Sequence, residues 1–285
     1  MAPKQLVWLI TGTSSGIGKD LTLAALKRGD KVIATARNLS KIDPVLKSNG
    51  ADILQLDVTD SLENLKKIAA DAVAIHGRVD VLVNNAGYVA VGALEETTPE
   101  ETFQQFNTNV FGALNVSRAF LPSLRERKSG TIFFIGSVGG WYGSAGIGLY
   151  MGTKHAIRGL AESLSLEVTP LGIKVYNIEP GYFRTDFLTP GNRSEYKPRI
   201  ADYNSVTQAA HESLVAYNGK QPGDPGKLVE IMIDIARGEG LVAGKGEVPV
   251  SFPLGSDCWK MIKEGFATRG KMMDDWKSVI ESTDF

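Results

Sequence analysis

Cysteine is almost absent from this sequence, and so are long hydrophobic runs. Cys258 is the only cysteine in 285 residues, so no disulfide can form within the chain, and this rarity suits a reducing compartment. We expect its thiol to be a partly buried bystander. The apolar run LVWLI near the start is too short for a secretory signal, and no stretch reaches the roughly 18 apolar residues of a membrane helix. We therefore expect a soluble cytoplasmic protein.

An excess of charge of either sign is also lacking. Lys and Arg number 31 against 32 Asp and Glu, which gives a formal net charge of −1, and the basic residues are spread along the chain. Neither nucleic acid nor a membrane is therefore expected as a partner. The histidines His76, His155 and His211 have no metal-ligand spacing, so no metal site is expected. Hydrophobic residues make up 43% of the chain, enough for a sizeable core.

Short apolar runs alternate with amphipathic stretches along most of the chain. The runs indicate buried strands, and the stretches repeat apolar residues every three or four positions, as helices do. Strands are expected over residues 6–10, 31–36, 51–56, 79–83, 131–135, 173–178 and 247–252. Helices are expected over residues 19–29, 61–76, 98–127, 148–169 and 227–237, with a mixed helical pattern over 256–282. This alternation predicts an α/β fold, a doubly wound, mostly parallel sheet of about seven strands with helices on both faces.

The longest expected helix, 98–127, opens with the cap sequence TPEE. It carries Asn107 and Asn109 in its middle, where asparagine is unfavourable, so we expect a polar task or a local kink there. Pro122 predicts a break or kink nearer its end.

We find no second alternating block and no internal repeat, so residues 1–285 are expected to form a single domain. Residues 183–225 are polar, rich in Asn, Pro, Ser and Tyr, and only weakly periodic. A long segment of this kind is usually a lid or a binding loop, and we interpret it as a substrate-binding insertion. Residues 253–285 are interpreted as a C-terminal extension that covers the sheet or meets another subunit.

The sequence YMGTK places Tyr150 and Lys154 four residues apart, on one face of a helix. A neighbouring ammonium favours the phenolate, so we expect the pKa of Tyr150 to lie below its reference near ~10. Such a tyrosine can exchange a proton with a substrate oxygen near neutral pH. Ser137 follows the expected strand 131–135, at the edge where open α/β sheets bind ligands. Taken alone, a Tyr-x3-Lys pair is also an ordinary pair of helix residues.

A glycine-rich stretch, TGTSSGIG, joins the first expected strand to the first expected helix. In this position glycines let the backbone approach a pyrophosphate, and the helix N-terminus supplies N–H groups to bind it. We expect dinucleotide binding here rather than a plain tight turn. The residues expected to contact the cofactor are Gly12, Ser14, Ser15, Gly16, Ile17 and Gly18.

The residue after the second strand discriminates between nicotinamide cofactors. An acidic residue there would bind the ribose of NAD and repel a 2′-phosphate, but here Ala36 is followed by Arg37. Arginine suits a phosphate, so NADP(H) is favoured over NAD(H), the alternative being a merely solvated arginine. Asp57 and Val58 are expected to hold the adenine, although Asp57 could instead begin a helix cap. Further cofactor contacts are expected from Asn85, Ala86 and Gly87 after the fourth strand.

These motifs together resemble the short-chain dehydrogenase/reductase family over nearly the whole chain. They follow the family's order at spacings typical of its shorter, single-domain branch. The matching motifs are TGTSSGIG at 11–18, NNAG at 84–87, Asn109, Ser137, YMGTK at 150–154 and PGYFRT at 180–185. The resemblance implies a Rossmann fold, and a carbonyl-reductase-like enzyme that reduces a ketone or aldehyde with NADPH, or runs in reverse. Homodimers and homotetramers are common in the family.

The resemblance also implies roles for individual residues. Tyr150 is the general acid or base, and Lys154 binds the nicotinamide ribose and lowers the Tyr150 pKa. Ser137 binds the substrate oxygen, and Asn109 holds a water that relays protons to Lys154. The carboxamide is framed by Pro180, Gly181, Phe183 and Thr185. The substrate is expected to contact Ser137, Gly139, Trp141, Tyr142, Tyr150, Tyr182 and Phe187, with plain packing an equal alternative for Trp141 and Tyr142.

Other functions are compatible with parts of this pattern. The chain could be a non-enzymatic NADP(H)-binding sensor or scaffold, or an NAD-dependent alcohol or steroid dehydrogenase. A nucleotide-sugar epimerase or dehydratase shares the Tyr–Lys pair. Such relatives usually carry TGxxGxxG and a larger C-terminal domain, whereas this loop reads TGxxxGxG, so this alternative is less favoured.

Overall fold

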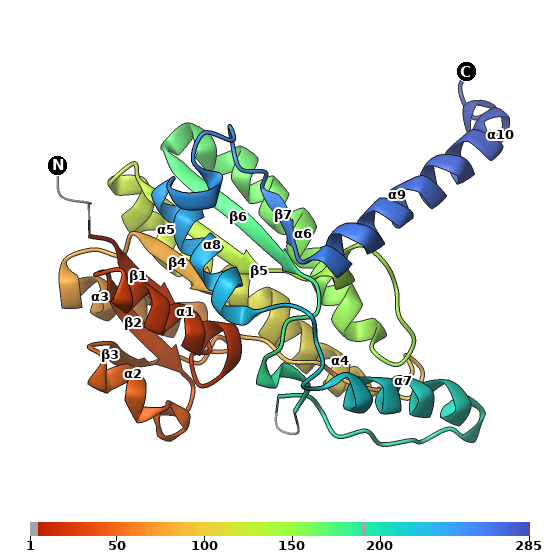
Figure 1. Ribbon diagram of the computed structural model, residues 1–285, viewed down its shortest axis with the longest axis horizontal. Helices are drawn as coiled ribbons and strands as arrows, with labels where there is room; N and C mark the ends of the chain where they lie inside the picture. The colour runs from red at the N-terminus through yellow and green to blue at the C-terminus, as the bar shows by residue number, and fades with distance from the viewer. Residues whose placement is uncertain (1–4, 190–191) are drawn as a thin grey trace.

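A parallel sheet forms the centre of the computed structural model, which describes residues 5–189 and 192–285 (Figure 1). Seven strands occur in these described residues, in the spatial order β3-β2-β1-β4-β5-β6-β7, and all neighbours pair in parallel. They are β1 (Val7–Ile10), β2 (Lys31–Ala36), β3 (Asp52–Gln55), β4 (Val81–Asn84), β5 (Gly130–Ile135), β6 (Ile173–Pro180) and β7 (Ser251–Leu254). The predicted α/β fold with a doubly wound sheet is confirmed.

Helices cover both faces of this sheet (Figure 1). One face packs against α3, α5 and α6, and the other against α1 and α8. The helices are α1 (Gly16–Lys27), α2 (Pro44–Ser48), α3 (Leu62–His76), α4 (Pro99–Phe106), α5 (Ala113–Glu126), α6 (Gly148–Val168), α7 (Asn204–Tyr217), α8 (Pro225–Arg237), α9 (Ser256–Asp275) and α10 (Lys277–Glu281).

Strand β1 shows why the strands read as continuous apolar runs. Successive side chains point to opposite faces, so Leu9 joins the core under α3, α5 and α6, while Trp8 and Ile10 join the core under α1 and α8. All three are fully buried. The Trp8 ring stacks on Phe133 of β5, with 6.3 Å between ring centroids.

The topology places the candidate site residues at one edge. Because all strands run in parallel, the segments that follow them meet at the carboxyl edge of the sheet. The strand order reverses between β1 and β4, since the chain winds first to β3 and then back past β1 to β7. The loop after β1 and the turn after β4 therefore flank the crevice in which open α/β sheets bind ligands.

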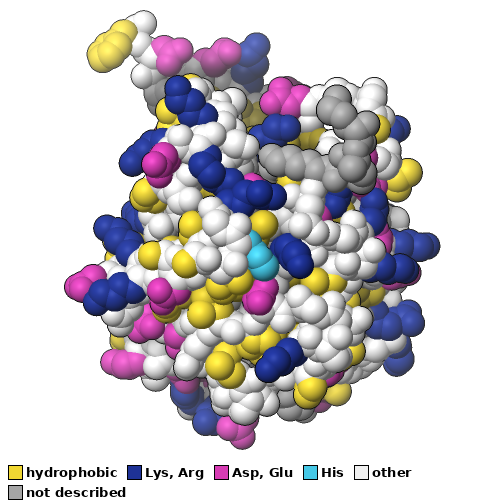
Figure 2. Space-filling view, turned by 90° about the vertical axis from the view of Figure 1, so that its left-hand side faces the viewer, with side chains coloured by type: hydrophobic (Ala, Val, Ile, Leu, Met, Phe, Trp, Pro, Cys, Tyr) yellow, Lys and Arg dark blue, Asp and Glu magenta, His cyan; other side chains and the backbone are white. Residues whose placement is uncertain are grey.

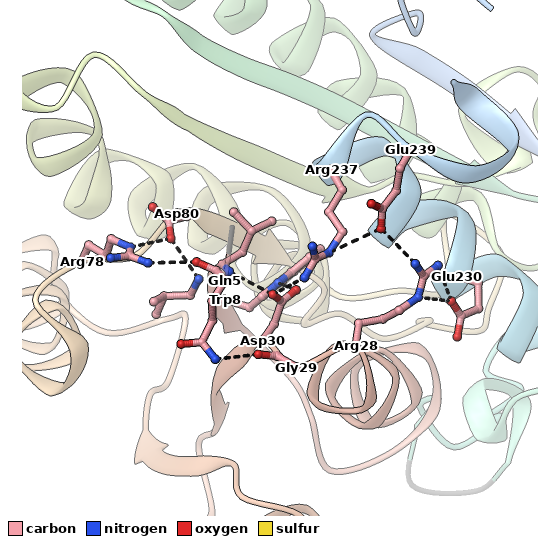
Figure 3. A network of polar contacts seen from close by, with 12 residues as sticks. Gln5, Trp8, Arg28, Gly29, Asp30, Arg78, Asp80, Glu230, Arg237 and Glu239 are labelled. Atoms are coloured by element: carbon pink, nitrogen blue, oxygen red, sulfur yellow. Dashed lines mark hydrogen bonds and ion pairs between the residues drawn. The ribbon is translucent and has the colours of Figure 1, made fainter. Parts of the chain in front are cut away.

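The opposite, amino edge of the sheet is held by a network of ion pairs and hydrogen bonds (Figure 3). The Trp8 indole donates to a carboxylate oxygen of Asp30 (2.9 Å), and Arg237 at the end of α8 pairs with the same buried carboxylate. Arg28 at the end of α1 pairs with Glu230 of α8 (2.8 Å). These contacts join β1, α1 and α8.

Asp80, just before β4, is a second anchor at this edge (Figure 3). Its carboxylate accepts hydrogen bonds from the backbone N–H of Val7 (3.0 Å) and from Arg78 and Arg127 (2.8 Å each). Burial alone would raise the pKa of Asp80, but the hydrogen bonds from Arg127 and Arg78 outweigh it and hold that pKa below its usual value.

The predicted long helix 98–127 is interrupted. Helix α4 ends at Phe106, residues 107–112 form a π-helical turn, and α5 continues to Glu126. The turn contains both asparagines, where a local distortion was expected. Helix α5 runs through Pro122, so the predicted break is absent, and the alternative of a kink stays a prediction. The buried Phe120 and Leu124 on either side hold this last part of the helix on the core.

Two further expectations need correction. The weakly periodic segment 183–225 contains a full helix, α7; residues 190 and 191 of this segment lie outside the described residues. Only Thr207 of α7 is buried, so its sequence shows no apolar stripe. The last strand is Ser251–Leu254 rather than 247–252, and it pairs with the carboxyl end of β6. Pro253, which lacks an N–H donor, is tolerated because β7 is an edge strand.

Charged side chains of both signs are interspersed on the face drawn in Figure 2. No helix among the described residues has both the length and the apolar character needed to cross a membrane.

Candidate active site

The glycine-rich loop after β1 is bound to the turn after β4. The Thr11 hydroxyl accepts hydrogen bonds from the backbone N–H groups of Asn85 (2.9 Å) and Ala86 (3.1 Å). The Asn85 amide nitrogen donates back to the carbonyl oxygens of Thr11 (2.8 Å) and Gly12 (3.0 Å). A methyl group on Gly18 would lie 2.5 Å from that nitrogen, so this approach requires glycine. The side chain of Asn85 thus supports the loop, a task that its motif alone did not reveal.

Helix α1 starts at the carboxyl edge, directly after this loop. Gly16 adopts a φ of +56°, a left-handed conformation that favours glycine. Ser14, Ser15 and Ile17 remain partly exposed, and within the described residues the Ser15 hydroxyl makes no capping hydrogen bond. Thr185 lies across from the loop, 3.5 Å from where a methyl group on Gly16 would be. The backbone N–H groups at the start of α1 can bind a pyrophosphate, and the glycines of the loop leave room for it to approach.

The turns after β2 and β3 carry the residues expected around the adenosine. Arg37 is exposed, and its carbonyl oxygen accepts a hydrogen bond from Gln55 (2.9 Å). Asp57 accepts from the backbone N–H (2.9 Å) and the hydroxyl (2.7 Å) of Thr59 through one oxygen. Asp57 therefore caps its own turn, while Val58 is buried. Both residues stand beside the crevice, as their place after a parallel strand requires.

Asn109 projects from the π-helical turn into the site. Its side-chain oxygen accepts from the backbone N–H of Tyr88 (3.1 Å), and its nitrogen donates to the Tyr88 carbonyl (3.0 Å) and to the Thr153 hydroxyl (3.3 Å). A methyl group on Gly87 would lie 3.2 Å from the side-chain oxygen. Asn109 thereby ties the turn after β4 to helix α6. Its role in holding a water remains a prediction.

Ser137 follows β5 and caps a short 3₁₀ turn, accepting a hydrogen bond from the backbone N–H of Gly139 (3.0 Å). The turn presses closely on α6. A methyl group on Gly139 would lie 2.6 Å from the sulfur of Met151, and one on Gly140 would lie 3.0 Å from the carbonyl oxygen of Lys154. Glycines at these two positions therefore hold Ser137 beside the helix.

Tyr150 and Lys154 lie one turn apart on α6, and both are buried. The Lys154 ammonium is 5.5 Å from the centroid of the Tyr150 ring and donates to the carbonyl oxygen of Ile135 at the end of β5 (2.5 Å). The Ser137 side chain lies near enough to the Tyr150 phenol to lower its pKa. The structure thus brings together Ser137, Tyr150 and Lys154, which are far apart or only loosely spaced in the sequence.

The expected lowering of the Tyr150 pKa is not what these groups produce. Burial raises the pKa of Tyr150 to about 12, and the hydrogen bond from Ser137 only partly offsets it. Burial also lowers the pKa of Lys154 to about 8. Desolvation disfavours the charged form of each group, and it is the largest influence on both pKa values.

The phenols of Tyr142 and Tyr182 lie close to that of Tyr150. Burial, and to a smaller extent the neighbouring Tyr182, raise the pKa of Tyr142 well above its usual value. Tyr182 also raises the pKa of Tyr150. Phe187 tilts over the Tyr150 ring, with 5.8 Å between centroids. Tyr182 is packed edge-on against Tyr217 of α7 (4.9 Å). These contacts place Tyr142, Tyr182 and Phe187 at the predicted substrate wall.

Most of the apolar wall around Tyr150 escaped the sequence analysis. Its members come from the turn after β4, from α6, and from the 183–225 segment, so no local pattern joins them. They are Val89, Val91, Ile147, Met151, Tyr196 and Leu214.

Trp141 lies on the other side of its loop. Its indole nitrogen donates to Glu179 at the end of β6 (2.8 Å), and its ring lies 3.4 Å from the guanidinium carbon of Arg158. The ring also meets Phe266 of α9 edge-on, with 5.2 Å between centroids. These contacts match the packing alternative for Trp141.

The PGYFRT segment continues from β6. A methyl group on Gly181 would overlap the carboxylate of Asp257, so a side chain is excluded there. Phe183 packs close to Gly223 and contacts the core under α1 and α8. Pro180 ends β6, and Thr185 faces the glycine-rich loop. The segment therefore lines the crevice through Thr185 and the backbone at Pro180 and Gly181, while the Phe183 ring turns to the core.

The segment that bears Tyr196 is fastened to the start of α4. Arg199 pairs with both carboxylate oxygens of Glu101 (2.6 and 2.7 Å). Hydrogen bonds from Arg199 and the Thr98 backbone lower the pKa of Glu101 to about 2. Glu96 accepts from the backbone N–H groups of Arg199 (2.8 Å) and Ile200 (3.0 Å). These residues were missed in the sequence because their partners lie about a hundred positions away.

Comparisons with known proteins agree with this geometry. A family model described as short chain dehydrogenase matches residues 6–195. An oxidoreductase of Botryotinia fuckeliana, BOA17, is 35% identical over 277 residues, which cover 96% of this chain and 97% of the relative.

Solved structures share the fold of this chain. A short-chain dehydrogenase from Streptomyces avermitilis, 37% identical, superposes with a TM-score of 0.87 and covers 100% of both chains. The protein ElxO with NADP bound, 27% identical, superposes with a TM-score of 0.72 over 90% of this chain and 100% of its own.

Proposed function

The chain belongs to the short-chain dehydrogenase family of oxidoreductases, and on that premise we propose that it interconverts a ketone or aldehyde with the alcohol by using NADP(H). The observation that carries the proposal is the convergence of Ser137, Tyr150 and Lys154 beside a loop that fits a dinucleotide. A pure binding protein has no need of this geometry, which disfavours the sensor or scaffold alternative.

Different residues of this chain would bind different parts of the cofactor. The backbone from Gly12 to Gly18 would hold the pyrophosphate, and Thr185 faces this loop from across the crevice. Arg37, helped by the Ser14 and Ser15 hydroxyls, holds the 2′-phosphate of the adenosine ribose. Val58 and the turn after β4 line the adenine. When bound, NADPH supplies the hydride that reduces the carbonyl carbon.

Proton transfer is the task of Tyr150. Its phenol is protonated at neutral pH, since burial keeps its pKa far above 7, and a protonated phenol is the form that a general acid requires. Together with the Ser137 hydroxyl it donates a hydrogen bond to the carbonyl oxygen, where negative charge grows during reduction. Lys154 binds the nicotinamide ribose, and its positive charge stabilises the phenolate that remains after Tyr150 has given up its proton.

The chemistry of the wall indicates the class of substrate. Valine, isoleucine, methionine, leucine and aromatic side chains surround Tyr150, and the phenols of Tyr142 and Tyr196 lie among them. We infer that the substrate is a neutral, bulky carbonyl compound whose apolar body packs against Phe187, Tyr196 and Leu214.

The test is the loss of NADPH absorbance against a panel of ketones, aldehydes, quinones and steroids. Tyr150→Phe removes the proton donor and keeps the ring, and we expect turnover to fall by about 10²- to 10⁴-fold, the usual contribution of a general acid. Tyr176→Phe is the matched control, because this phenol lies under α8, in the core on the far face. Turnover that survives in Tyr150→Phe would refute the assignment. Bound NADPH without turnover on the whole panel would favour the sensor.

A further inference from the structure

The C-terminal arm, residues 256–285, leaves the body of the molecule (Figure 1). Its first turns are anchored, since Cys258 and Ile262 are buried against the loop that follows Ser137. From Phe266 to Phe285 every residue is exposed. Helix α9 is nevertheless 20 residues long and is followed almost without interruption by α10. Most of the stability of a helix in a protein comes from packing of its apolar face, and the projecting part of this helix packs against nothing in the chain described.

The exposed part of the arm is not polar. Phe266, Met272, Met273, Trp276, Val279 and Ile280 are all large, apolar and between 42% and 57% exposed. The positions Trp259, Ile262, Phe266, Met273, Trp276 and Ile280 fit a spacing of alternately three and four residues, interrupted once at Arg269. Within α9 this spacing places the first four on one stripe, the pattern by which two helices pack along their length, and Trp276 and Ile280 continue the spacing through the turn into α10. Such a stripe on a projecting helix indicates a missing partner.

The charges of the arm argue against a membrane surface as that partner. Basic and acidic residues nearly balance, so the arm has no attraction for anionic lipid. They are Lys260, Lys263, Arg269, Lys271 and Lys277 against Asp257, Glu264, Asp274, Asp275, Glu281 and Asp284.

The distribution of these charges favours an antiparallel copy of the same arm. The anchored half, residues 256–270, carries three basic and two acidic side chains and is net basic, whereas the projecting half, residues 271–285, carries two basic and four acidic ones and is net acidic. Parallel arms would bring like charges together. Antiparallel arms set the basic half of each against the acidic half of the other.

The base of the arm offers a place for the tip of such a partner. A hollow of about 170 Å³ lies between the arm and the loop after Ser137, lined by Trp141, Tyr142, Met261, Phe266 and Arg269 among others. With the crossing near Gly270, the helix rise of about 1.5 Å per residue sets Trp276 of one arm beside Phe266 of the other. In that register Ile280 of the second copy reaches Ile262 and the hollow.

We propose that residues 256–285 form an interface in which two copies of this chain pair their arms antiparallel, each tip seated at the base of the other. Six large side chains about half exposed supply several hundred Å² on each copy, approaching the roughly 800 Å² per partner of a stable interface. This inference rests on the arm alone and not on the proposed reaction.

The first test is molar mass in solution by light scattering. The double variant Trp276→Glu, Ile280→Glu changes only exposed side chains, so the body still folds. We expect its molar mass to be half that of the unaltered protein, whatever the full assembly is. Leu241→Glu, at an even more exposed position outside the arm, is expected to change nothing. A monomer of 30.7 kDa before substitution, or an unchanged mass after it, overturns the proposal.

The second test reads the orientation by disulfide cross-linking. Gly270 is not in a left-handed conformation, and nothing lies within 4 Å of a methyl group placed there, so Gly270→Cys is tolerated. Antiparallel arms bring the two thiols introduced by this substitution together and predict a reducible covalent dimer, whereas Val279→Cys at the tips gives none. The native thiol of Cys258 is buried and forms no cross-link between copies in this experiment. Cross-linking at 279 but not at 270, or at neither position, contradicts the proposed pairing.

Discussion

At the scale of single residues, burial has the largest effect on the pKa values of Tyr150 and Lys154. Tyr150 and Lys154 sit under Phe187 and the loop after Ser137, where each charged form has lost its water. The motif shows that a phenol and an ammonium lie on one face, but it says nothing about how deeply they are covered. Hence the pair could be predicted from the sequence, and the direction of the Tyr150 pKa could not.

A spectroscopic titration checks this direction. Because burial raises the pKa of Tyr150 to about 12 from 10.0, we expect the protein alone to show no Tyr150 phenolate at or below pH 10. The measurement is the near-ultraviolet tyrosinate absorbance of the unaltered protein minus that of Tyr150→Phe, followed against pH. A difference signal that rises near neutral pH would restore the lowered pKa that the motif predicts.

Arg37 is the residue on which cofactor choice depends. Its guanidinium is exposed after β2, and we expect Arg37→Ala to raise the KM for NADPH by about 10- to 100-fold, the loss of one hydrogen-bonded charge pair. The KM for NADH should change little, since NADH has no 2′-phosphate. Lys41→Ala removes another exposed charge nearby and serves as the control. Equal losses for both cofactors in Arg37→Ala would exclude the phosphate role.

At the scale of elements, those with strong local signals were predictable. The buried strands read as apolar runs, and TPEE at the start of α4 forms a full capping box, with Thr98 and Glu101 each bonded to the other's backbone. Helix α7 lacks such a signal, because it is held by distant contacts such as that between the Tyr196 and Thr207 hydroxyls (2.9 Å). The apolar wall around Tyr150 is likewise a product of tertiary folding, since Val89 and Leu214 share no local pattern.

The start of α1 depends on a glycine that the helix itself does not need. Gly18→Ala would force its methyl group against the amide of Asn85, at 2.5 Å, and the carbonyl of Gly12, at 2.6 Å. We expect a loss of about 1–3 kcal/mol of unfolding free energy and a marked weakening of NADPH binding. Denaturant unfolding and a nucleotide titration measure the two effects.

Gly159 provides the matched control. It lies exposed within α6, and nothing lies within 4 Å of a methyl group placed there. Gly159→Ala should therefore stabilise the protein by about 0.5–1 kcal/mol without affecting nucleotide affinity. If the two alanines behaved alike, the contact between the loop and Asn85 would not be the cause.

At the scale of the whole molecule, a buried carboxyl group makes stability depend on pH. Glu179 is fully buried at the end of β6, and burial raises its pKa to about 7 from 4.5, against the opposing hydrogen bond from Trp141 and the charge of Arg158. The folded state therefore binds a proton that the unfolded state has released. The stability that this proton contributes is complete below pH 4.5 and is lost as pH rises towards 7.

Glu179→Gln removes this dependence, because an amide does not titrate. We expect the Tm of the unaltered protein, relative to that of the variant, to decrease between about pH 5 and about pH 8. Calorimetry at both pH values measures it, and the comparison within each pH cancels the contributions of other groups. A constant difference between the two proteins would show that Glu179 is ionised throughout.

The ion pairs between α1 and α8 affect stability beyond the amino edge of the sheet, where they lie. Arg28 of α1 pairs with Glu230 and Asp234 of α8, so neither helix can open alone without leaving charges unpaired. The same α1 begins at the candidate nucleotide site. Opening of α1 would also release a nucleotide bound at its start, so the binding free energy adds to the free energy of opening. The ion pairs extend this protection to α8. We therefore expect the two helices to open together, and a nucleotide bound at one edge of the sheet to slow amide exchange at the other edge as well.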